Sequence, residues 1–344
     1  MEARRPRRTG GGSDGEPVCV LLNLFSHRKI WNLPEGRDEE MRRRFPEVRF
    51  TLAAGAAAFR ENLPKADVLF SWHLPPGMLP HARRLRWLHT PAAGIEHLLY
   101  PALRASEVQI TNGRGLAGDA MAEHALALML TLSRRIHDAV RMQIAQKWSQ
   151  DLFWASEPAP FRLAGRTLGI VGLGGIGSEL ARRARALGMR VMAIRRRPGP
   201  RPRFVDVLLG PEGMPQLLEQ SDFVVLSAPL TPETRGMIGA AQLGRMRKTA
   251  YLINVGRGEM VNESALVRAL RAGKIAGAAL DVFQTEPLPR RSILWRAPNL
   301  LISPHYAGTY PEHVARAADL FEENLRRFLR GRSLRNLVDK EAGY

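Results

Sequence analysis

Three side chains that could carry out acid–base chemistry follow apolar runs in the second half of the chain. They are an arginine, a glutamate and a histidine, each directly after a stretch of β-type residues: Arg257 after 251–254, Glu286 after 278–283 and His305 after 300–303. Ligands of a doubly wound sheet bind outside the carboxyl ends of its strands, so we expect all three to reach one crevice. Taken singly, each has an ordinary explanation, as a helix cap, a solvated turn and a structural histidine.

Taken together, the three residues suit hydride transfer to a 2-oxo acid. The planar guanidinium of Arg257 can bind the substrate carboxylate and polarise the neighbouring carbonyl. The imidazolium of His305 can donate a proton to the carbonyl oxygen as hydride arrives at carbon. A carboxylate at Glu286 would favour the charged imidazole and hold its tautomer.

A glycine-rich turn indicates where the hydride comes from. The β run 167–171 enters the sequence GLGGIG, and a helix is expected from Ser178, before a second β run at 191–194. In this context the pattern is typical of dinucleotide binding, with the pyrophosphate held by N–H groups at the helix start. A tight turn without a ligand is the alternative. We expect cofactor contacts from five residues of the turn: Gly172, Gly174, Gly175, Ile176 and Gly177.

The residues after run 191–194 predict which dinucleotide is preferred. NAD-dependent proteins of this fold usually have an Asp or Glu here, which accepts a hydrogen bond from the ribose 2′-hydroxyl. This chain has Arg195, Arg196 and Arg197 instead. Guanidinium groups bind a 2′-phosphate, whereas a carboxylate would repel it. We therefore predict a preference for NADP(H), through Arg195 and Arg196, with NAD(H) as the second cofactor.

The elements that would position these residues alternate between short β runs and helical stretches. The β runs cover 18–24, 48–53, 67–72, 85–89, 108–111, 167–171, 191–194, 223–227, 251–254, 278–283 and 300–303. Such alternation predicts parallel sheets with helices on both faces. We therefore expect an α/β protein with two doubly wound parallel-sheet domains.

Three segments stand outside this alternation. A long helix is expected over 119–140, and because it is apolar around most of its circumference it should be buried between domains or subunits. Residues 148–161 combine aromatic, proline and polar residues, which indicates a loop. The chain should close with an amphipathic helix over 311–330.

Composition argues against several other classes of protein. The 344 residues are 45% hydrophobic, which is enough for a core in each of two domains. Of the 51 basic residues behind the net charge of +18, 45 are arginines, and they are spread over the chain rather than gathered in a nucleic-acid-binding patch. Such a charge also attracts an anionic substrate and cofactor. No segment is apolar enough to span a membrane, and no His, Asp or Glu spacing predicts a metal site.

The N-terminal region and the cysteine usage indicate the compartment. Cys19 is the only cysteine, so an intrachain disulfide is excluded, as is usual in the reducing cytoplasm. Residues 1–16 are rich in Arg, Gly and Pro and lack the apolar core of a secretion signal, so we expect a flexible basic tail. We predict a cytoplasmic protein without a nucleic-acid or membrane partner.

Several motifs, in this order, resemble those of the D-isomer-specific 2-hydroxyacid dehydrogenases: GLGGIG, NVGRG, LDVFQTEPLP and ISPHYAG. The resemblance extends upstream to HTPAAGIEHL and NGRGLAGDAMAEHALALML and so covers roughly residues 85–310. It implies that Arg257, Glu286 and His305 are catalytic and that the product is a D-2-hydroxy acid. It also implies a homodimer built on the long helix. The cofactor domain, residues 116–308, would be a Rossmann domain inserted into a flavodoxin-like substrate domain made of 17–115 and 309–344.

The resemblance also implies further contacts with substrate and cofactor. The family's substrate loop, whose N–H groups bind the carboxylate, is matched by Ala92, Ala93 and Gly94. Its cofactor contacts are matched by Asp281, near the nicotinamide amide, and by Ala228 and Pro229, in the turn on the adenosine side. We expect cofactor contacts from Val255 and Gly256 of the NVGRG motif as well.

The segment WHLPP, residues 72–76, occupies a substrate-domain loop whose sequence varies within the family. Here it is similar to the loop of the glyoxylate and hydroxypyruvate reductases. It predicts reduction of a small 2-oxo acid such as glyoxylate or hydroxypyruvate.

Several alternatives stay open. His73 could contact the substrate or lie in a surface loop, and Trp148 or Trp154 could reach a partner's active site or pack locally. Formate dehydrogenases have Gln where this chain has Glu286. A dinucleotide-sensing regulator, like the C-terminal-binding-protein corepressors on the same scaffold, is the alternative function, although no DNA-binding motif is present.

Overall fold

The computed structural model describes residues 16–155, 159–197 and 199–343. The predicted flexible tail, residues 1–16, lies outside these ranges except for Glu16. The chain forms two compact units, one from the residues up to Leu116 together with those from Tyr310 on, and the other from Ala117–Thr309. None of the described helices is long and apolar enough to cross a membrane.

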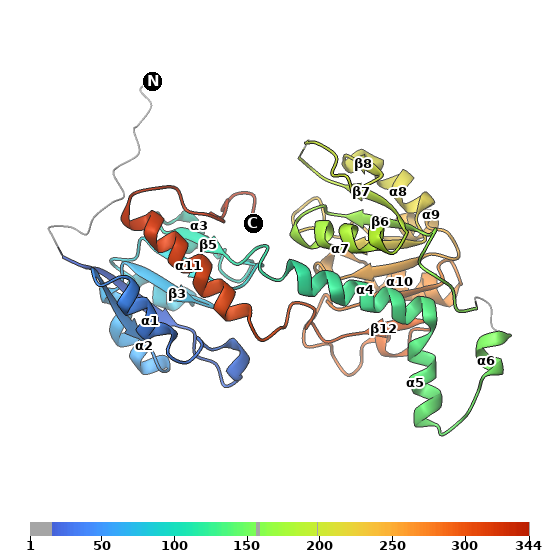
Figure 1. Cartoon of the computed structure of the whole chain (residues 1–344), viewed down its shortest axis with the longest axis horizontal. Helices are drawn as coiled ribbons and strands as arrows, with labels where there is room; N and C mark the ends of the chain where they lie inside the picture. The colour runs from blue at the N-terminus through green and yellow to red at the C-terminus, as the bar shows by residue number, and fades with distance from the viewer. Residues whose placement is uncertain (1–15, 156–158, 198, 344) are drawn as a thin grey trace. The chain divides into compact units, whose positions relative to one another are not determined.

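The first unit is a five-stranded parallel sheet with the strand order β2-β1-β3-β4-β5 (Figure 1). Its strands are β1 Val18–Asn23, β2 Val48–Leu52, β3 Val68–Ser71, β4 Trp87–Thr90 and β5 Gln109–Asn112. Its α-helices are α1 Arg37–Arg44, α2 Ala56–Asn62, α3 Pro101–Ala105 and α11 His313–Leu329.

Alternate side chains of these strands enter two separate cores, one on each face of the sheet. Leu22 packs with α1 and α11, whereas the neighbouring Leu21 packs with α2 and α3. At the centre of the α11 face, Phe321 stacks on Phe70 at 4.6 Å and on Trp87 at 5.1 Å. Strands buried on both faces explain the nearly continuous apolar runs in the sequence.

The second unit is a seven-stranded parallel sheet with the strand order β12-β11-β10-β9-β6-β7-β8. Its strands are β6 Thr167–Val171, β7 Arg190–Ile194, β8 Val207–Leu209, β9 Phe223–Leu226, β10 Tyr251–Asn254, β11 Gly277–Leu280 and β12 Leu300–Ile302. Its α-helices are α4 Gly118–Arg134, α5 Ile136–Ile144, α6 Asp151–Trp154, α7 Gly175–Ala186, α8 Met214–Gln220, α9 Ala240–Arg245 and α10 Glu263–Arg271.

The order of these strands creates a switch point beside the glycine-rich turn. From β6 the chain moves outward to β7 and β8, and then returns to β9 on the other side of β6. The loops after β6 and β9 therefore leave the sheet in opposite directions and open a crevice at its carboxyl edge. Helices α4 and α7 cover one face of this sheet, and α8, α9 and α10 cover the other. The predicted fold class, two doubly wound parallel sheets, is confirmed.

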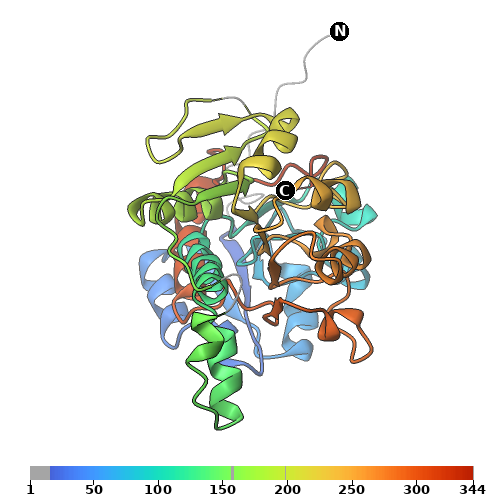
Figure 2. The same ribbon diagram turned by 90° about the vertical axis from the view of Figure 1, so that its right-hand side faces the viewer.

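The helix predicted over 119–140 is wrong in one respect, because it breaks at Arg135. Helix α4 ends at Arg134, and Arg135 has a left-handed backbone with φ 56° before α5 begins. Two carbonyls near the end of α4 have partners outside the helix: Thr131 O lies 3.2 Å from His137 Nδ1, and Ser133 O accepts from Phe161 N. Figures 1 and 2 show α5 and α6 projecting away from the sheet of this unit. The loop predicted over 148–161 contains the one-turn helix α6.

Candidate active site

The glycine-rich turn after β6 is shaped by two close approaches. Gly172 has φ 103°, and a Cβ there would lie 2.6 Å from the backbone nitrogen of Ala228. A Cβ on Gly177 would lie 2.3 Å from the carbonyl oxygen of Gly172. Only glycine fits at both places, so the turn lies tightly against the end of β9 and the helix lies tightly against the turn. Helix α7 begins at Gly175, earlier than the predicted Ser178.

Gly174 is different, because neither conformation nor packing requires it to be glycine. Its φ is −93°, and a Cβ there would meet nothing within 4 Å. The first hydrogen bond of α7 runs from Ser178 N to Gly174 O, which leaves the amides of Gly175, Ile176 and Gly177 without partners inside the helix. Open space in front of free amides at a helix start fits a pyrophosphate group.

Ala228 adjoins this turn, Gly256 lies next to Ala228, and Pro229 follows Ala228 in the loop after β9. A Cβ on Gly256 would lie 3.1 Å from Ala228 O, and the carbonyl of Pro229 accepts from Thr234 Oγ1 at 2.8 Å. Val255 is fully buried, so its backbone is the part that could contact a ligand. The structure therefore brings the predicted dinucleotide residues to one edge of the sheet.

The two arginines after β7 differ in their surroundings. Nη2 of Arg195 donates to Pro200 O at 3.2 Å, within its own loop. Arg196 is exposed and lies near Glu233. A hydrogen bond from Thr231, another from the backbone amide of Glu233 itself and, more weakly, the charge of Arg196 hold the pKa of Glu233 below its ordinary value. Arg196 therefore already faces an anion at the place where a 2′-phosphate would be recognised.

His305 and Glu286, predicted from separate strand ends, form a direct pair. His305 Nδ1 lies 2.5 Å from Glu286 Oε2, and the other carboxylate oxygen accepts from Phe283 N at 2.9 Å. The side chain of His305 is 52% exposed, so its other ring nitrogen can reach a ligand. A carboxylate accepts hydrogen bonds only, which places a proton on Nδ1 of His305.

Arg257 lies at the end of β10, next to the strand whose loop carries Glu286. Its Nη1 donates to Gly256 O at 2.8 Å, and its carbonyl accepts from Asn254 Nδ2 at 2.8 Å. A Cβ on Gly258 would lie 1.9 Å from the carbonyl carbon of Phe283, so the loops after β10 and β11 are packed together. The three predicted catalytic side chains thus come from three adjacent strand ends.

Asp281 is fully buried behind His305. Its Oδ1 accepts from Ser303 Oγ at 2.7 Å and from Tyr306 N at 3.2 Å, and its Oδ2 accepts from Ala307 N at 3.0 Å. A contact with the nicotinamide amide stays a prediction. The sequence did not indicate Ser303 or His124, whose Nε2 lies 3.0 Å from Ser303 Oγ, since the bond joins residues 179 positions apart.

The predicted substrate loop lies in the first unit, and its carbonyl groups are held by neighbouring elements. Ala92 O accepts from Gly113 N at 2.9 Å, and Ala93 O accepts from Asn112 Nδ2 at 2.8 Å. Within the described part of the chain, the amides of Ala93 and Gly94 have no hydrogen-bond partner. The loop therefore presents N–H groups, as carboxylate binding requires.

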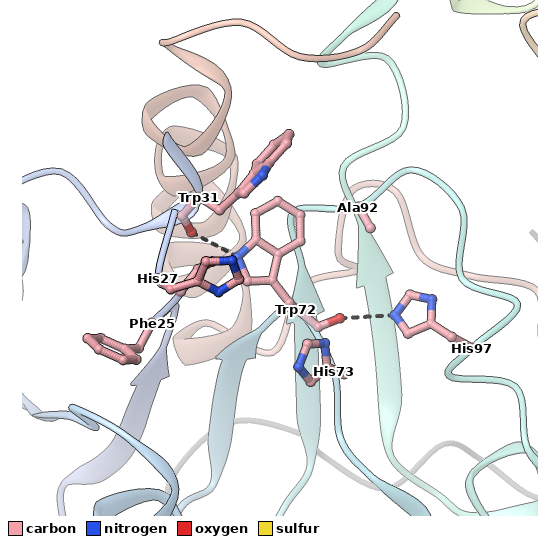
Figure 3. Close-up of a pocket in the computed structure, with 8 residues that line it drawn as sticks. Phe25, His27, Trp31, Trp72, His73, Ala92 and His97 are labelled. Atoms are coloured by element: carbon pink, nitrogen blue, oxygen red, sulfur yellow. Dashed lines mark hydrogen bonds between the residues drawn. The ribbon is translucent and has the colours of Figure 1, made fainter. Parts of the chain in front are cut away.

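A cavity of about 770 Å³ adjoins this loop at Ala92. Its lining consists of aromatic and histidine residues together with Ser26 and Ala92: Phe25, His27, Trp31, Trp72, His73 and His97. Figure 3 shows the Trp72 indole directed at the carbonyl of Trp31, with a hydrogen bond of 2.9 Å, and His97 bonded to the carbonyl of Trp72. Burial, followed by the charge of His97, lowers the pKa of His73. His73, left open from the sequence, thus faces a cavity.

The described residues contain no group of three or more His, Cys, Asp or Glu side chains that could hold a metal ion. The glycine turn at the switch point and the paired histidine and glutamate define a dinucleotide-dependent enzyme of the Rossmann type.

Comparison with known proteins shows the family. Residues 126–307 match the NAD-binding domain of the D-isomer-specific 2-hydroxyacid dehydrogenases. A glyoxylate reductase of Korarchaeum cryptofilum is 40% identical over 82% of this chain and 85% of that protein. A glycerate dehydrogenase of Methylorubrum extorquens is 36% identical over 74% and 79%. The chain belongs to the D-isomer-specific 2-hydroxyacid dehydrogenases.

Solved structures agree with this membership. A family member from Xanthobacter autotrophicus, in complex with NADPH and MES, is 30% identical with a TM-score of 0.80, over 96% of this chain and 100% of that one. An NADPH-dependent glyoxylate/hydroxypyruvate reductase from Sinorhizobium meliloti, with NADP and sulfate, is 27% identical with a TM-score of 0.77, over 95% and 100%. The predictions of the family and of a nicotinamide-dependent oxidoreductase are confirmed. None of these relatives supports the regulator alternative.

Proposed function

We propose that this enzyme uses NADPH to reduce small 2-oxo acids such as glyoxylate and hydroxypyruvate to D-2-hydroxy acids. The observation that carries the proposal is the His305–Glu286 pair, 2.5 Å apart, on the sheet edge that also holds the glycine turn. Relatives named glyoxylate reductase support the substrate class. The net charge of +18 would favour the approach of anionic acids and nucleotides.

The dinucleotide would be held by the chain's own amides and arginines. The N–H groups of Gly175, Ile176 and Gly177 would bind the pyrophosphate, and Arg195 and Arg196 would bind the 2′-phosphate. When bound, the reduced nicotinamide supplies the hydride. Solved relatives that contain NADPH or NADP support this preference. We place the enzyme in the cytoplasm, where a lone thiol such as Cys19 stays reduced.

The residues at the strand ends would provide the remaining chemistry. Arg257 binds the substrate carboxylate and polarises the carbonyl. His305, with Nδ1 bonded to Glu286, donates the proton on Nε2 to the carbonyl oxygen. The carboxylate of Glu286 stabilises the imidazolium before that transfer and fixes the ring afterwards. Proton donation and carboxylate binding thus come from different strands of one sheet.

The unit that carries the parallel sheet β1–β5 would be the substrate domain, comprising residues 17–115 and 309–344, and residues 116–308 would be the cofactor domain. The amides of Ala93 and Gly94 would bind the substrate carboxylate. The substituent on the 2-oxo acid would enter the cavity beside Ala92, where His73 contributes to the lining.

A homodimer would cover the arm formed by α5 and α6. Three large side chains of this arm are exposed: Ile144 by 78%, Trp148 by 93% and Trp154 by 70%. Isolated exposed apolar residues are ordinary, but several on one projecting arm indicate an interface. Light scattering of the parent and of Ile144→Glu tests this: a dimer that the substitution splits supports the proposal, and a monomeric parent contradicts it.

The activity itself is tested by NADPH oxidation with glyoxylate, hydroxypyruvate, pyruvate and phenylpyruvate, with His305→Asn as the control. We expect higher turnover with glyoxylate and hydroxypyruvate than with the other two acids. The His305→Asn control should lose turnover with all four. The same assay with NADH separates the two cofactors. Binding of NADPH without turnover of any 2-oxo acid would contradict the proposal.

A further inference from the structure

The loop that carries His305 adopts a backbone conformation that has to be held in place. His305 has φ 49°, in the left-handed region that L-residues rarely occupy. Its amide donates to Asp281 O at 2.8 Å, and the next two amides, of Tyr306 and Ala307, donate to the Asp281 carboxylate. A single buried residue directly after β11 therefore holds the turn after β12, through both its backbone carbonyl and its carboxylate. The orientation of the His305 ring depends on the conformation of that turn.

A second residue, His124 of α4, also bonds to this arrangement. Its Nε2 lies 3.0 Å from Ser303 Oγ and 3.5 Å from Asp281 Oδ1. Its ring meets that of Tyr306 edge to face, with centroids 4.8 Å apart. Among the described residues, the side-chain contacts of His124 given by the structure all lead to the loop of His305 or to the aspartate that holds it.

The direction of these hydrogen bonds can be assigned. The Asp281 carboxylate only accepts, so the Ser303 hydroxyl donates to it, and the same hydroxyl oxygen then accepts from the N–H on Nε2 of His124. Burial lowers the pKa of His124, and the charge of Asp281 opposes this shift without cancelling it. His124 therefore acts at neutral pH as an uncharged hydrogen-bond donor.

Ordinary helix packing would explain a buried side chain on α4, but it would not explain these polar bonds, since an apolar side chain packs better there. We propose that His124 is a positioning residue that fixes the His305 loop through Ser303 and Asp281. The inference rests on the proposed function of His305 as the proton donor. His124, on α4, would then support the catalytic residues at the carboxyl edge of the sheet.

The test compares His124→Phe, which keeps a ring against Tyr306 but no donor, with His124→Gln, which keeps an N–H donor but no ring. A displaced proton donor costs turnover steeply, so we expect kcat of His124→Phe to fall by roughly 10- to 100-fold. His124→Gln should recover most of that loss. NADPH affinity should change little in either variant, because the pyrophosphate site at α7 is untouched. The control is Glu123→Gln, which changes the adjacent, exposed residue of α4.

A parent-like kcat in His124→Phe would overturn the inference. Equal losses in the Phe and Gln variants would overturn it too, because they would show that the N–H donor does not restore turnover. If His124→Phe no longer binds NADPH, Ser303→Ala replaces it in the comparison, with the same two outcomes. His305→Asn separates this inference from the proposed function. If His305→Asn is active, the catalytic assignment fails. If it is inactive while His124→Phe is parent-like, only the positioning role fails.

Discussion

The imidazole of His305 and the carboxylate of Glu286 lie 2.5 Å apart, although 19 positions separate them in the sequence. Each follows a different strand, and the parallel pairing of β11 with β12 brings the two loops together. The carboxylate is itself held by Phe283 N at 2.9 Å. One carboxylate oxygen of Glu286 is therefore held by the backbone, and the other binds Nδ1 of His305. The second ring nitrogen of His305, Nε2, stays available to a substrate.

Replacing His305 by Ala should remove the proton donor. A positioned general acid usually contributes about 10²- to 10⁴-fold, so kcat should fall by that factor while NADPH binding is retained. Single-turnover kinetics with fluorescence titration of NADPH separate the two effects. A variant with more than a tenth of the parental kcat would exclude His305 as the acid.

Replacing Arg257 by Ala should weaken both substrate binding and turnover, since the guanidinium contacts carboxylate and carbonyl alike. The loss of charged hydrogen bonds in a partly desolvated site should cost about 2–5 kcal/mol in kcat/KM. Arg257→Lys keeps the charge without the planar fork and should recover only part of the loss. Kinetics within threefold of the parent would refute the assignment.

The strand ends of this site could be predicted because each buried strand is short, apolar and followed by a break in the pattern. Strands β6 and β10 lie as predicted, and GLGGIG identified the switch point before the sheet order was known. The edge strand β8 was missed because it has only three residues. All three are half-buried, so they show neither a long apolar run nor an alternation of apolar and polar residues.

Other features could not be predicted because they depend on contacts between distant segments. Arginine is an ordinary helix residue, so the sequence gives no sign of the left-handed backbone at Arg135, where carbonyls at the end of α4 contact His137 and Phe161. Similarly, in the sequence His124 is one polar residue within a mostly apolar helix, and nothing near it in the chain indicates a role. Its role depends on Ser303, which the sequence places far away.

The buried His89 should make stability depend on pH in the acid range. Burial lowers its pKa from 6.5 to about 3, and its Nδ1 lies 2.7 Å from Thr111 Oγ1. The unfolded chain therefore binds a proton below pH 6.5 that the folded chain does not bind until about pH 3. The stabilisation is complete above pH 6.5 and is lost as the pH falls, at about 1.4 kcal/mol per pH unit.

The comparison variant for this prediction is His89→Leu, which cannot titrate. Urea unfolding at pH 7 and pH 5 should show that the parent loses about 2 kcal/mol more than the variant over this interval. Using the difference between the two proteins removes the contribution of other groups that titrate in both. Equal pH dependence in parent and variant would contradict the burial of a neutral His89.

A further prediction concerns the choice between the two dinucleotides. Without an acid after β7, NADPH should be preferred over NADH in kcat/KM, and Arg195→Ala with Arg196→Ala should remove the preference. Because Nη2 of Arg195 is bonded to Pro200 O, we expect Arg196→Ala to have the larger single effect. Steady-state kinetics with both cofactors measure this. An equal or higher kcat/KM for NADH in the parent would refute the prediction.

Glu233 provides a second, opposite test of the same site. Its carboxylate lies near Arg196 and would compete with a 2′-phosphate for that guanidinium. Glu233→Gln should therefore strengthen NADPH binding and leave NADH binding unchanged. Since the pair is exposed and screened by solvent, the gain should be small, about two- to fivefold at low salt, and should shrink as salt is added. Weaker NADPH binding in Glu233→Gln would show that the carboxylate positions Arg196 instead of competing for it.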